Sequence, residues 1–435
     1  MRKSSLFILG FFLFFLTSLV ALVVASNRYD GWAQVRVSSF YVPNEAVIGE
    51  LANRDWGIPA HGDFAPLPDY LQQSLAWLAE NQTANGGWGA GLHSQQNVRD
   101  PQQVATDPAT TAMVAMAFLR SGTTLQEGAY RPTLANATEY LISATEAADH
   151  QAFNITDRTG TQPQTKLGAN VDVALAAQFF ARLTPYLSHD PLTYQRVTAA
   201  LDRCIAMLEA SQENDGSWNN RGWATVLNSA MGNNALELAE RVGRPVNRDA
   251  MQRSQQYQRS NVYADGSVST ESAAGVPLYA LSSTQRATAS SANMTRQALN
   301  EMNQKTDTLS TQLAIEALRQ QGVSEEEATT MAADYVANVQ AARQVLREDV
   351  QRGFGNNGGE EFLSHMLTSE SLAAMGGAEW ESWYSRMNEL YSNIQNGNAS
   401  WSGHHCITSP VFCTAAVVMA MTADREPRAL MALGS

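Results

Sequence analysis

The chain repeats one short phrase three times, and this repeat constrains the fold more than any other feature of the sequence. The copies are QTANGGW, QENDGSW and QNGNASW, which end at Trp88, Trp218 and Trp401. In each copy a Gln precedes the Trp by six residues, and a large residue precedes that Gln by four: Leu78, Leu208 and Tyr391. Because one helical unit cannot bury its apolar face alone, repeated units of this kind predict a repeat architecture.

Each phrase has the composition of a junction between two helices. The upstream Leu or Tyr ends an apolar helix, the Asn, Asp and Gly residues break it, and the small residue before the Trp lets the backbone turn closely under the ring. The Trp can bury a large surface, and the Gln amide can bond to backbone groups left open at helix ends. We therefore predict that each phrase is a clasp, a junction that holds the end of one helix against the start of the next.

The phrase resembles the Gln-Trp repeat of the squalene cyclase, terpene cyclase and protein prenyltransferase group. Members of that group fold as a closed ring of paired inner and outer helices, an α/α toroid. The resemblance covers residues 66–425, although a further copy that begins at Gln258 has Val268 where the Trp would stand. It implies an all-α toroid, and it implies less about function because one scaffold hosts many activities.

Two kinds of helix alternate along the chain. Residues 107–122 carry the start and stop signals of a helix, with Asp107 as N-cap, Pro108 at the first helical position and Gly122 after the last turn. The residues between these signals are apolar on all sides of the helix. Stretches of similar buried character follow at 171–183, 223–239, 309–318, 363–375 and 411–421. Amphipathic stretches lie between them, at 134–145, 194–211, 248–258, 325–350 and 379–394. This alternation predicts about six inner and five or six outer helices, with a helix near 294–302 and a long loop around Pro277.

The N-terminus predicts export. Arg2 and Lys3 precede residues 6–25, which carry no charge and match the length of a membrane-spanning helix. Residues 1–25 are then either a signal peptide cleaved after Ala25 or a membrane anchor, and the length of the apolar run favours the anchor. The domain would lie outside the cytoplasm, or be secreted or periplasmic after cleavage. We assign 26–65 to a linker or strap, 66–425 to the toroid and 426–435 to a tail. The net charge of -13 argues against a nucleic-acid partner.

The densest group of reactive side chains follows the third clasp and consists of His404, His405, Cys406 and Cys413. Imidazoles and thiols are zinc ligands, and the resemblance implies a zinc site at the mouth of the toroid, although the Asp-x-Cys pair of the prenyltransferases has no clean match here. Two alternatives stay open. Cys406 and Cys413 could form a disulfide, with Cys204 as a core residue, or one thiol could be catalytic.

Three residues are candidates for acid or base chemistry. In squalene cyclases an Asp at the start of an inner helix protonates the substrate, so the resemblance points to Asp107 and Asp172, although the chain contains no DxDD or DDxxD. Both are alternatively helix-capping residues. His365, with Glu360 and Glu361 one turn earlier, is either an acid/base or metal group or a hydrogen-bonded core residue. Tryptophans that could line a cavity or build the clasps are Trp218, Trp223, Trp380, Trp383 and Trp401.

Three functions remain open on these observations. The first is an enzyme acting on an isoprenoid or other apolar lipid in a central cavity. The second is a non-catalytic toroid that binds a partner or polymer of the cell envelope, and the third is a polysaccharide lyase or hydrolase. No phosphate loop, nucleophile elbow or His-Glu-x-x-His occurs. We expect an apolar tunnel ending in a buried carboxylate for the first function, and a polar or filled centre for the second.

Overall fold

The computed structural model describes residues 54–59, 63–149, 151–218, 222–263, 265–302, 309–353 and 358–431. Contacts between Cα atoms divide the chain into two compact units, Met1–Asn44 and Glu45–Ser435, and every described residue belongs to the second. The predicted membrane segment, residues 6–25, lies outside these ranges. Within them, no helix combines the length and the apolar character needed to cross a bilayer.

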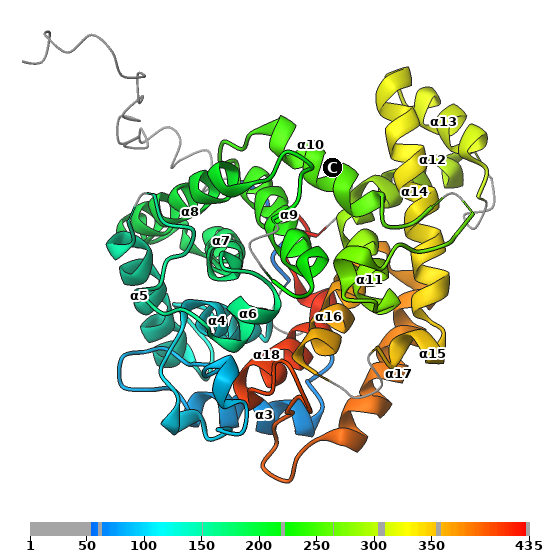
Figure 1. Cartoon of the computed structure of the whole chain (residues 1–435). Helices are drawn as coiled ribbons and strands as arrows, with labels where there is room; N and C mark the ends of the chain where they lie inside the picture. Colours follow the sequence, from blue (N-terminus) through cyan, green and yellow to red (C-terminus); the bar gives the residue numbers. More distant parts are fainter. Residues whose placement is uncertain are drawn as a thin grey trace, which may run out of the picture. The chain divides into compact units, whose positions relative to one another are not determined.

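Six helices pack side by side into a closed ring (Figure 1). Each inner helix contacts the next one in chain order, and the last contacts the first. They are α4 (Pro108–Arg120), α7 (Val171–Leu183), α9 (Thr225–Arg241), α11 (Pro277–Ala287), α16 (Gly359–Met375) and α18 (Pro410–Met421). Nearly every residue of these helices is buried, as the all-round apolar character of most of them predicts.

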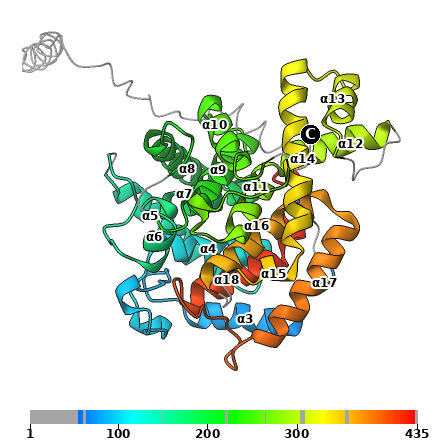
Figure 2. The same ribbon diagram turned by 45° about the vertical axis from the view of Figure 1, so that its right-hand side comes forward.

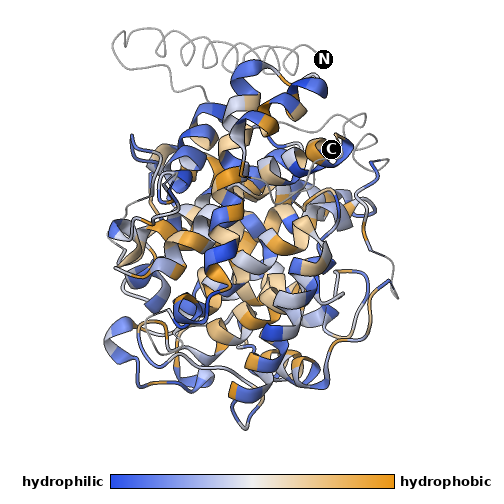
Figure 3. Cartoon of the chain, turned by 90° about the vertical axis from the view of Figure 1, so that its right-hand side faces the viewer, coloured by the Kyte–Doolittle hydropathy of each residue, from blue (hydrophilic) through white to orange (hydrophobic). Residues whose placement is uncertain are grey.

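A second helix covers each inner helix from outside. The pairs are α3 (Asp69–Glu80) on α18, α5 (Arg131–Ala147) on α4, α8 (Pro191–Ser211) on α7, α10 (Arg248–Arg259) on α9, α14 (Glu325–Val345) on α11 and α17 (Gly377–Ile394) on α16. Figure 3 shows apolar positions gathered on the central helices and hydrophilic ones along the periphery. Across the described ranges the structure is all-helical, and these six pairs match the predicted α/α toroid.

Short helical segments connect these pairs. They are η1 (His93–Gln95), η2 (Pro101–Gln103), α6 (Gln162–Lys166), η3 (Thr184–Leu187), η4 (Glu271–Ala273), α15 (Glu348–Gln351) and η5 (Ala423–Arg425).

One inner helix differs from the prediction. Residues 309–318 do not join the ring, because α13 (Thr311–Gln320) packs with α12 (Ala289–Glu301) and α14 in a separate apolar cluster (Figure 2). The ring position belongs to α11, in the region predicted to be a loop around Pro277. Five consecutive polar residues of α11, Ser282 to Arg286, are buried. A helix that buries polar side chains lacks the apolar periodicity by which helices are recognised in a sequence.

The three clasps hold the ends of outer helices as predicted. In each, the indole N–H of the Trp donates to a carbonyl ten residues earlier, in the last turn of the preceding outer helix. The donor and acceptor pairs are Trp88 and Leu78 at 2.9 Å, Trp218 and Leu208 at 2.9 Å, and Trp401 and Tyr391 at 3.0 Å. Each bond satisfies one of the carbonyls that a helix end leaves open.

The same clasps reach two further helices. The backbone N–H of each Trp donates over 3.0 Å to a hydroxyl on the next inner helix, of Thr111, Ser229 or Thr414. The Gln amide donates to a carbonyl in the first turn of the next outer helix, of Thr133, Ala250 or Tyr70. Tyr70 belongs to α3, so the third clasp joins the C-terminal part of the ring to its N-terminal part.

The clasp turn requires a left-handed residue two places before the Trp. Gly86, Gly216 and Ala399 have φ angles of 88°, 90° and 62° there. A Cβ at Gly216 would also lie 2.2 Å from the carbonyl oxygen of Arg253. The sequence-based interpretation placed the tight turn at the residue directly before the Trp, and the structure shifts it one residue earlier. Ala399 carries a side chain in a conformation that favours glycine.

The packed structure extends past residue 425. Glu426 and Leu430 are buried, so the segment predicted to be a tail begins inside the core. Trp56, in the region predicted to be a strap, is also buried, and its carbonyl accepts a hydrogen bond of 3.1 Å from the N–H of Ala429. The described residues around Trp56 therefore pack against the chain that follows α18.

Candidate functional site

An ion-pair network occupies the centre of the ring near the C-terminal ends of the inner helices. Its buried members are Arg120 on α4, Arg182 on α7, Glu237 on α9, Arg286 on α11, Glu370 on α16 and Glu426 after η5. Glu370 Oε1 lies 2.7 Å from Arg120 Nη2 and 3.0 Å from Arg182 Nη2. Because α7 lies opposite α16 in the ring, these side chains cross its centre and fill it at this level.

The charges of the network balance, with three guanidinium groups against three carboxylates. Burial by itself raises the pKa of Glu370, but Arg120, Arg182 and Arg286 outweigh it and lower that pKa to about 2. A cation in the last turn of a helix is also favoured by the helix dipole, and Arg120, Arg182 and Arg286 occupy such positions. Glu370 therefore stays ionised at neutral pH, and this level of the ring is not an apolar tunnel.

Asp107 is the N-cap of α4. Its Oδ1 accepts the N–H of Thr110 at 2.8 Å, and its Oδ2 accepts the N–H of Ala90 and the hydroxyl of Thr110, both at 2.9 Å. Burial raises its pKa despite these bonds. Both oxygens are engaged in holding the first clasp to the start of α4, which is the capping role weighed for this residue.

Asp172 lies in the first turn of α7. Its Oδ2 accepts the N–H of Ile155 at 3.0 Å, and its Oδ1 accepts the N–H of Val173 at 2.9 Å. Burial raises its pKa to about 8, and the nearby Asp107 adds to the shift. The structure therefore brings the two predicted aspartates near each other, where Asp172 holds the loop that contains Ile155.

His365 is a buried residue of α16. Its Nδ1 lies 3.1 Å from the hydroxyl of Tyr391, and its ring meets Trp383 edge-on at 5.9 Å between centroids. Burial lowers its pKa to about 4, so it is neutral at pH 7. This is the environment of a core histidine.

The four predicted zinc ligands are not assembled. His404 is exposed, whereas Cys413 is buried with its thiol 3.7 Å from the carbonyl of Ile407. No group of three or more His, Cys, Asp or Glu side chains is placed to hold a metal ion in the described part of the chain. Cys406 and Cys413 are both free thiols rather than a disulfide. These residue types fit zinc, but their positions do not.

A polar group that includes Cys406 lies where the inner helices begin. Burial, followed by the nearby Glu360, raises the pKa of the half-buried Cys406 thiol to about 11. Burial raises the pKa of Glu360 itself to about 7, and its neighbour Glu361 adds to this. Lys166 lies beside the thiol and over the ring of Trp223 at 4.7 Å. Glu360 was noted in the sequence only as a companion of His365, which lies one turn further along α16.

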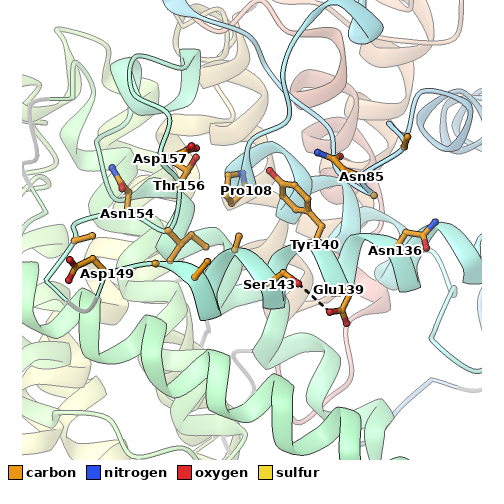
Figure 4. A pocket seen from close by; sticks show the side chains of 17 residues that line it. Asn85, Pro108, Asn136, Glu139, Tyr140, Ser143, Asp149, Asn154, Thr156 and Asp157 are labelled. Atoms are coloured by element: carbon orange, nitrogen blue, oxygen red, sulfur yellow. Dashed lines mark hydrogen bonds between the residues drawn. The ribbon is translucent and has the colours of Figure 1, made fainter.

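A concave site lies on the rim of the ring, and we call it the rim pocket (Figure 4). It has a volume of about 800 Å³ and lies between the first clasp, the outer face of α5 and residues 148, 149, 152 and 154–157. Its lining consists of Ala84, Asn85, Gly86, Pro108, Asn136, Glu139, Tyr140, Ser143, Ala144, Ala147, Ala148, Asp149, Ala152, Asn154, Ile155, Thr156 and Asp157. Its size is typical of ligand sites.

The fold explains why this face of α5 is polar. The opposite face, with Leu134, Leu141 and Ile142, is buried against α4 and α8. Residues 136, 140, 143 and 147 recur at helical spacing on the free face and line the pocket. The facing wall is held from behind, because Asp172 binds the N–H of Ile155. Sequence reasoning missed the pocket, since its lining comes from segments that are separate in the sequence, but it identified Asp172.

No known protein family matches the sequence, and no curated protein matches it. One similar solved structure is the type II terpene cyclase MstE from Scytonema without ligand, with 14% identity, a TM-score of 0.43, and coverage of 82% of this chain and 97% of that chain. A second is a variant of the same enzyme in complex with its substrate geranylgeranyl dihydroxybenzoate, with 13% identity, a TM-score of 0.43, and coverage of 82% and 96%. The sequence identities and the TM-scores of these two matches are too low to assign a family or an activity to this chain.

Proposed function

We propose that the chain is a non-catalytic binding protein, an α/α toroid that engages a partner or polymer of the cell envelope at its rim pocket. The observation that carries this proposal is the network around Glu370, which fills the centre of the ring with charged side chains near the C-terminal ends of the inner helices. A site for an apolar substrate needs an apolar cavity, and burying such a substrate against charged groups would be unfavourable. The rim pocket is open, and its lining mixes polar side chains with alanines.

The residues predicted for acid chemistry also support binding rather than catalysis. Asp172 holds the backbone N–H groups of Ile155 and Val173 with its two carboxyl oxygens. Asp107 uses both of its oxygens to hold backbone and hydroxyl groups. The assignment to the cell envelope rests on the predicted export through residues 6–25.

The test is a variant that fills the rim pocket. Ser143 is exposed near the middle of the pocket-lining face of α5, so Ser143→Trp should block the pocket without entering the core. Ser392→Trp, on the exposed face of α17, is the matched control. Ligand-detected NMR of the full-length protein in mild detergent would compare neutral, amine-bearing and acidic oligosaccharides with short peptides.

We expect at least one probe class to bind the wild type and the Ser392→Trp variant but not the Ser143→Trp variant. If no probe depends on the open pocket, the proposal is overturned. The parallel measurement is mass spectrometry of products after incubation with squalene and with geranylgeraniol. Conversion of either compound would also overturn the proposal.

A second candidate function, chemistry on an isoprenoid or other apolar lipid, is favoured by one observation. Glu360 is a buried carboxyl in the first turn of an inner helix, and its Oε1 makes no regular hydrogen bond among the described residues. A proton donor at the start of an inner helix is what the resemblance implied. Isoprenoid conversion that disappears in Glu360→Gln and persists in Ser143→Trp would select this function.

A further inference from the structure

The lining of the rim pocket identifies the chemistry of its ligand. We propose that the rim pocket binds a saccharide, either neutral or amine-bearing, and that it rejects acidic saccharides. This inference rests on the proposed binding function, and it adds the ligand class.

The first argument is the pairing of uncommitted amides with a half-buried aromatic ring. The side-chain amides of Asn136 and Asn154 have no hydrogen-bond partner among the described residues. An amide both donates and accepts, which suits hydroxyl groups that do the same. The Tyr140 ring rises from α5 toward Pro108 and Asn85 (Figure 4), and one edge of it packs beside Gly87. An aromatic ring with a few polar groups around it suits a ligand with apolar faces and a polar edge, as a sugar ring has.

The second argument is the size and smoothness of the pocket. Between the polar groups the wall is made of small side chains, which are Ala84, Ala144, Ala147, Ala148 and Ala152. They leave a volume of about 800 Å³, which is room for more than one sugar ring. A small metabolite would leave much of this wall in contact with water, so an oligosaccharide is the better fit.

The third argument is charge. Glu139, Asp149 and Asp157 line the pocket, and no Lys, Arg or His is found among the described residues of its lining. Arg196, on α8, reaches Glu139 from outside the pocket at 2.7 Å. Arg158 follows the lining in sequence, is exposed to solvent and acts electrostatically on Tyr140, so the three carboxylates outnumber these two arginines. Carboxylates that face a ligand repel a second anion, so a uronic acid or a phosphorylated sugar would bind more weakly than a neutral or amine-bearing one.

The pocket wall is also anchored, which reduces the ordering cost of binding. Asp172 holds Ile155 from behind, and the hydroxyl of Thr156 accepts a hydrogen bond of 3.1 Å from the N–H of Arg158. Asn85 is fixed through its contact of 2.9 Å with the hydroxyl of Thr106. A site built from fixed elements loses less conformational entropy when a ligand binds.

The experiment measures the affinity of the full-length protein for four tetrasaccharides by isothermal titration calorimetry. The probes are cellotetraose and N-acetylchitotetraose, which are neutral, chitosan tetraose, which bears amines, and tetragalacturonate, which is acidic. We expect a neutral or amine-bearing probe to bind at least tenfold more tightly than tetragalacturonate. An acidic probe that binds as tightly as the others would overturn the charge argument and with it the proposal.

Variants locate the binding. Asn136→Ala and Asn154→Ala should each weaken binding roughly fivefold, the loss expected for one hydrogen bond. Tyr140→Ala should weaken it more than Tyr140→Phe, because the Phe variant keeps the ring. Asn393→Ala, at an exposed helical Asn on α17, is the matched control and should change nothing. Saccharide binding that is unchanged in the Asn154→Ala and Tyr140→Ala variants would overturn the proposal.

The outcomes separate this inference from the proposed function. If a peptide binds and is blocked by Ser143→Trp while no saccharide binds, the rim pocket is a binding site for another class of ligand and only the saccharide inference fails. If Ser143→Trp blocks nothing, both fail.

Discussion

Removing the charge of Glu370 should destabilise the ring strongly. In Glu370→Gln the side chain keeps its shape, but Arg120, Arg182 and Arg286 lose the carboxylate that they share. The pKa of Glu370 falls from 4.5 to about 2, which corresponds to roughly 3 kcal/mol at 1.36 kcal/mol per pH unit. Breaking a buried ion pair by removing one partner costs about 3–5 kcal/mol. Both figures predict a loss of about 3–5 kcal/mol in the free energy of unfolding.

The loss has a measurable size in a thermal melt. Unfolding entropy is about 2.1 cal/mol/K per residue, and the unit Glu45–Ser435 contains about 390 residues. A loss of 3–5 kcal/mol therefore lowers the Tm by about 4–6 °C. Circular dichroism of the wild type and the variant at pH 7 would measure this shift, and urea denaturation would measure the free energy.

The pH dependence tests the cause. The folded-state pKa of Glu370 lies below its unfolded value, so its contribution is complete above about pH 4.5 and is lost as the pH falls toward about 2. The difference in stability between wild type and Glu370→Gln should therefore narrow steadily below pH 5. Glu348→Gln is the control, because Glu348 forms an exposed pair with Arg352, and such pairs contribute little. A difference under about 1 kcal/mol at pH 7, or one that does not narrow in acid, would refute the reasoning.

Three further changes test other parts of the structure. Ala399→Gly should raise the free energy of unfolding by about 0.5–1 kcal/mol, because glycine adopts the left-handed backbone conformation of this position without strain. Gly216→Ala introduces that strain and should lower the free energy of unfolding by more than this amount. Urea denaturation of each variant measures both changes. Burial raises the pKa of Asp172 to about 8, so the free energy of unfolding of the wild type should fall as the pH rises from about 4 to 8. The slope is at most about 1.4 kcal/mol per pH unit, and the Asp172→Asn variant should not show it. Iodoacetamide at pH 7.5 should label Cys406 first and roughly a hundredfold more slowly than an unperturbed thiol, with the buried Cys413 labelled only after unfolding. A mass that shows a disulfide between these two cysteines would contradict the structure.

The parts of the fold that could be predicted are those governed by local rules. The helix after Asp107 has a cap, a proline and an apolar interior in the sequence, and α4 begins and ends as these signals predict. The clasps were recognisable because one spacing recurs three times. The helix α11 was missed because its buried face is polar, and α13 was taken for an inner helix because its apolar spacing does not reveal which neighbour it packs on.

The candidate site was harder to predict because its parts are distant in sequence. Arg120 and Arg182 each stand alone in an otherwise apolar stretch, AFLRSG and FFARLT. An isolated charged residue in a buried helix indicates that an oppositely charged side chain lies nearby, but the sequence does not show which residue that is. The rim pocket offers less, because Asn154 lies in a loop and Asn136 on an exposed helix face. The first clasp, which lines the pocket, and Asp172, which holds its wall, were identified in advance.

The third clasp sets the order in which the chain can complete its fold. Gln395 reaches Tyr70 across 325 residues, so α3 gains its last partner only after almost the whole chain has been synthesised. Contacts between such distant residues carry a large loop-closure entropy and tend to form late. Until then α3 would expose the leucines that it later buries against α18, a state prone to aggregation. A circular permutant that begins at α17 would join the natural ends of the chain, so that α17, the third clasp and α18 precede α3 in sequence. The contact between Gln395 and Tyr70 would then be closer in sequence, and we expect this permutant to refold faster and to aggregate less than the natural chain.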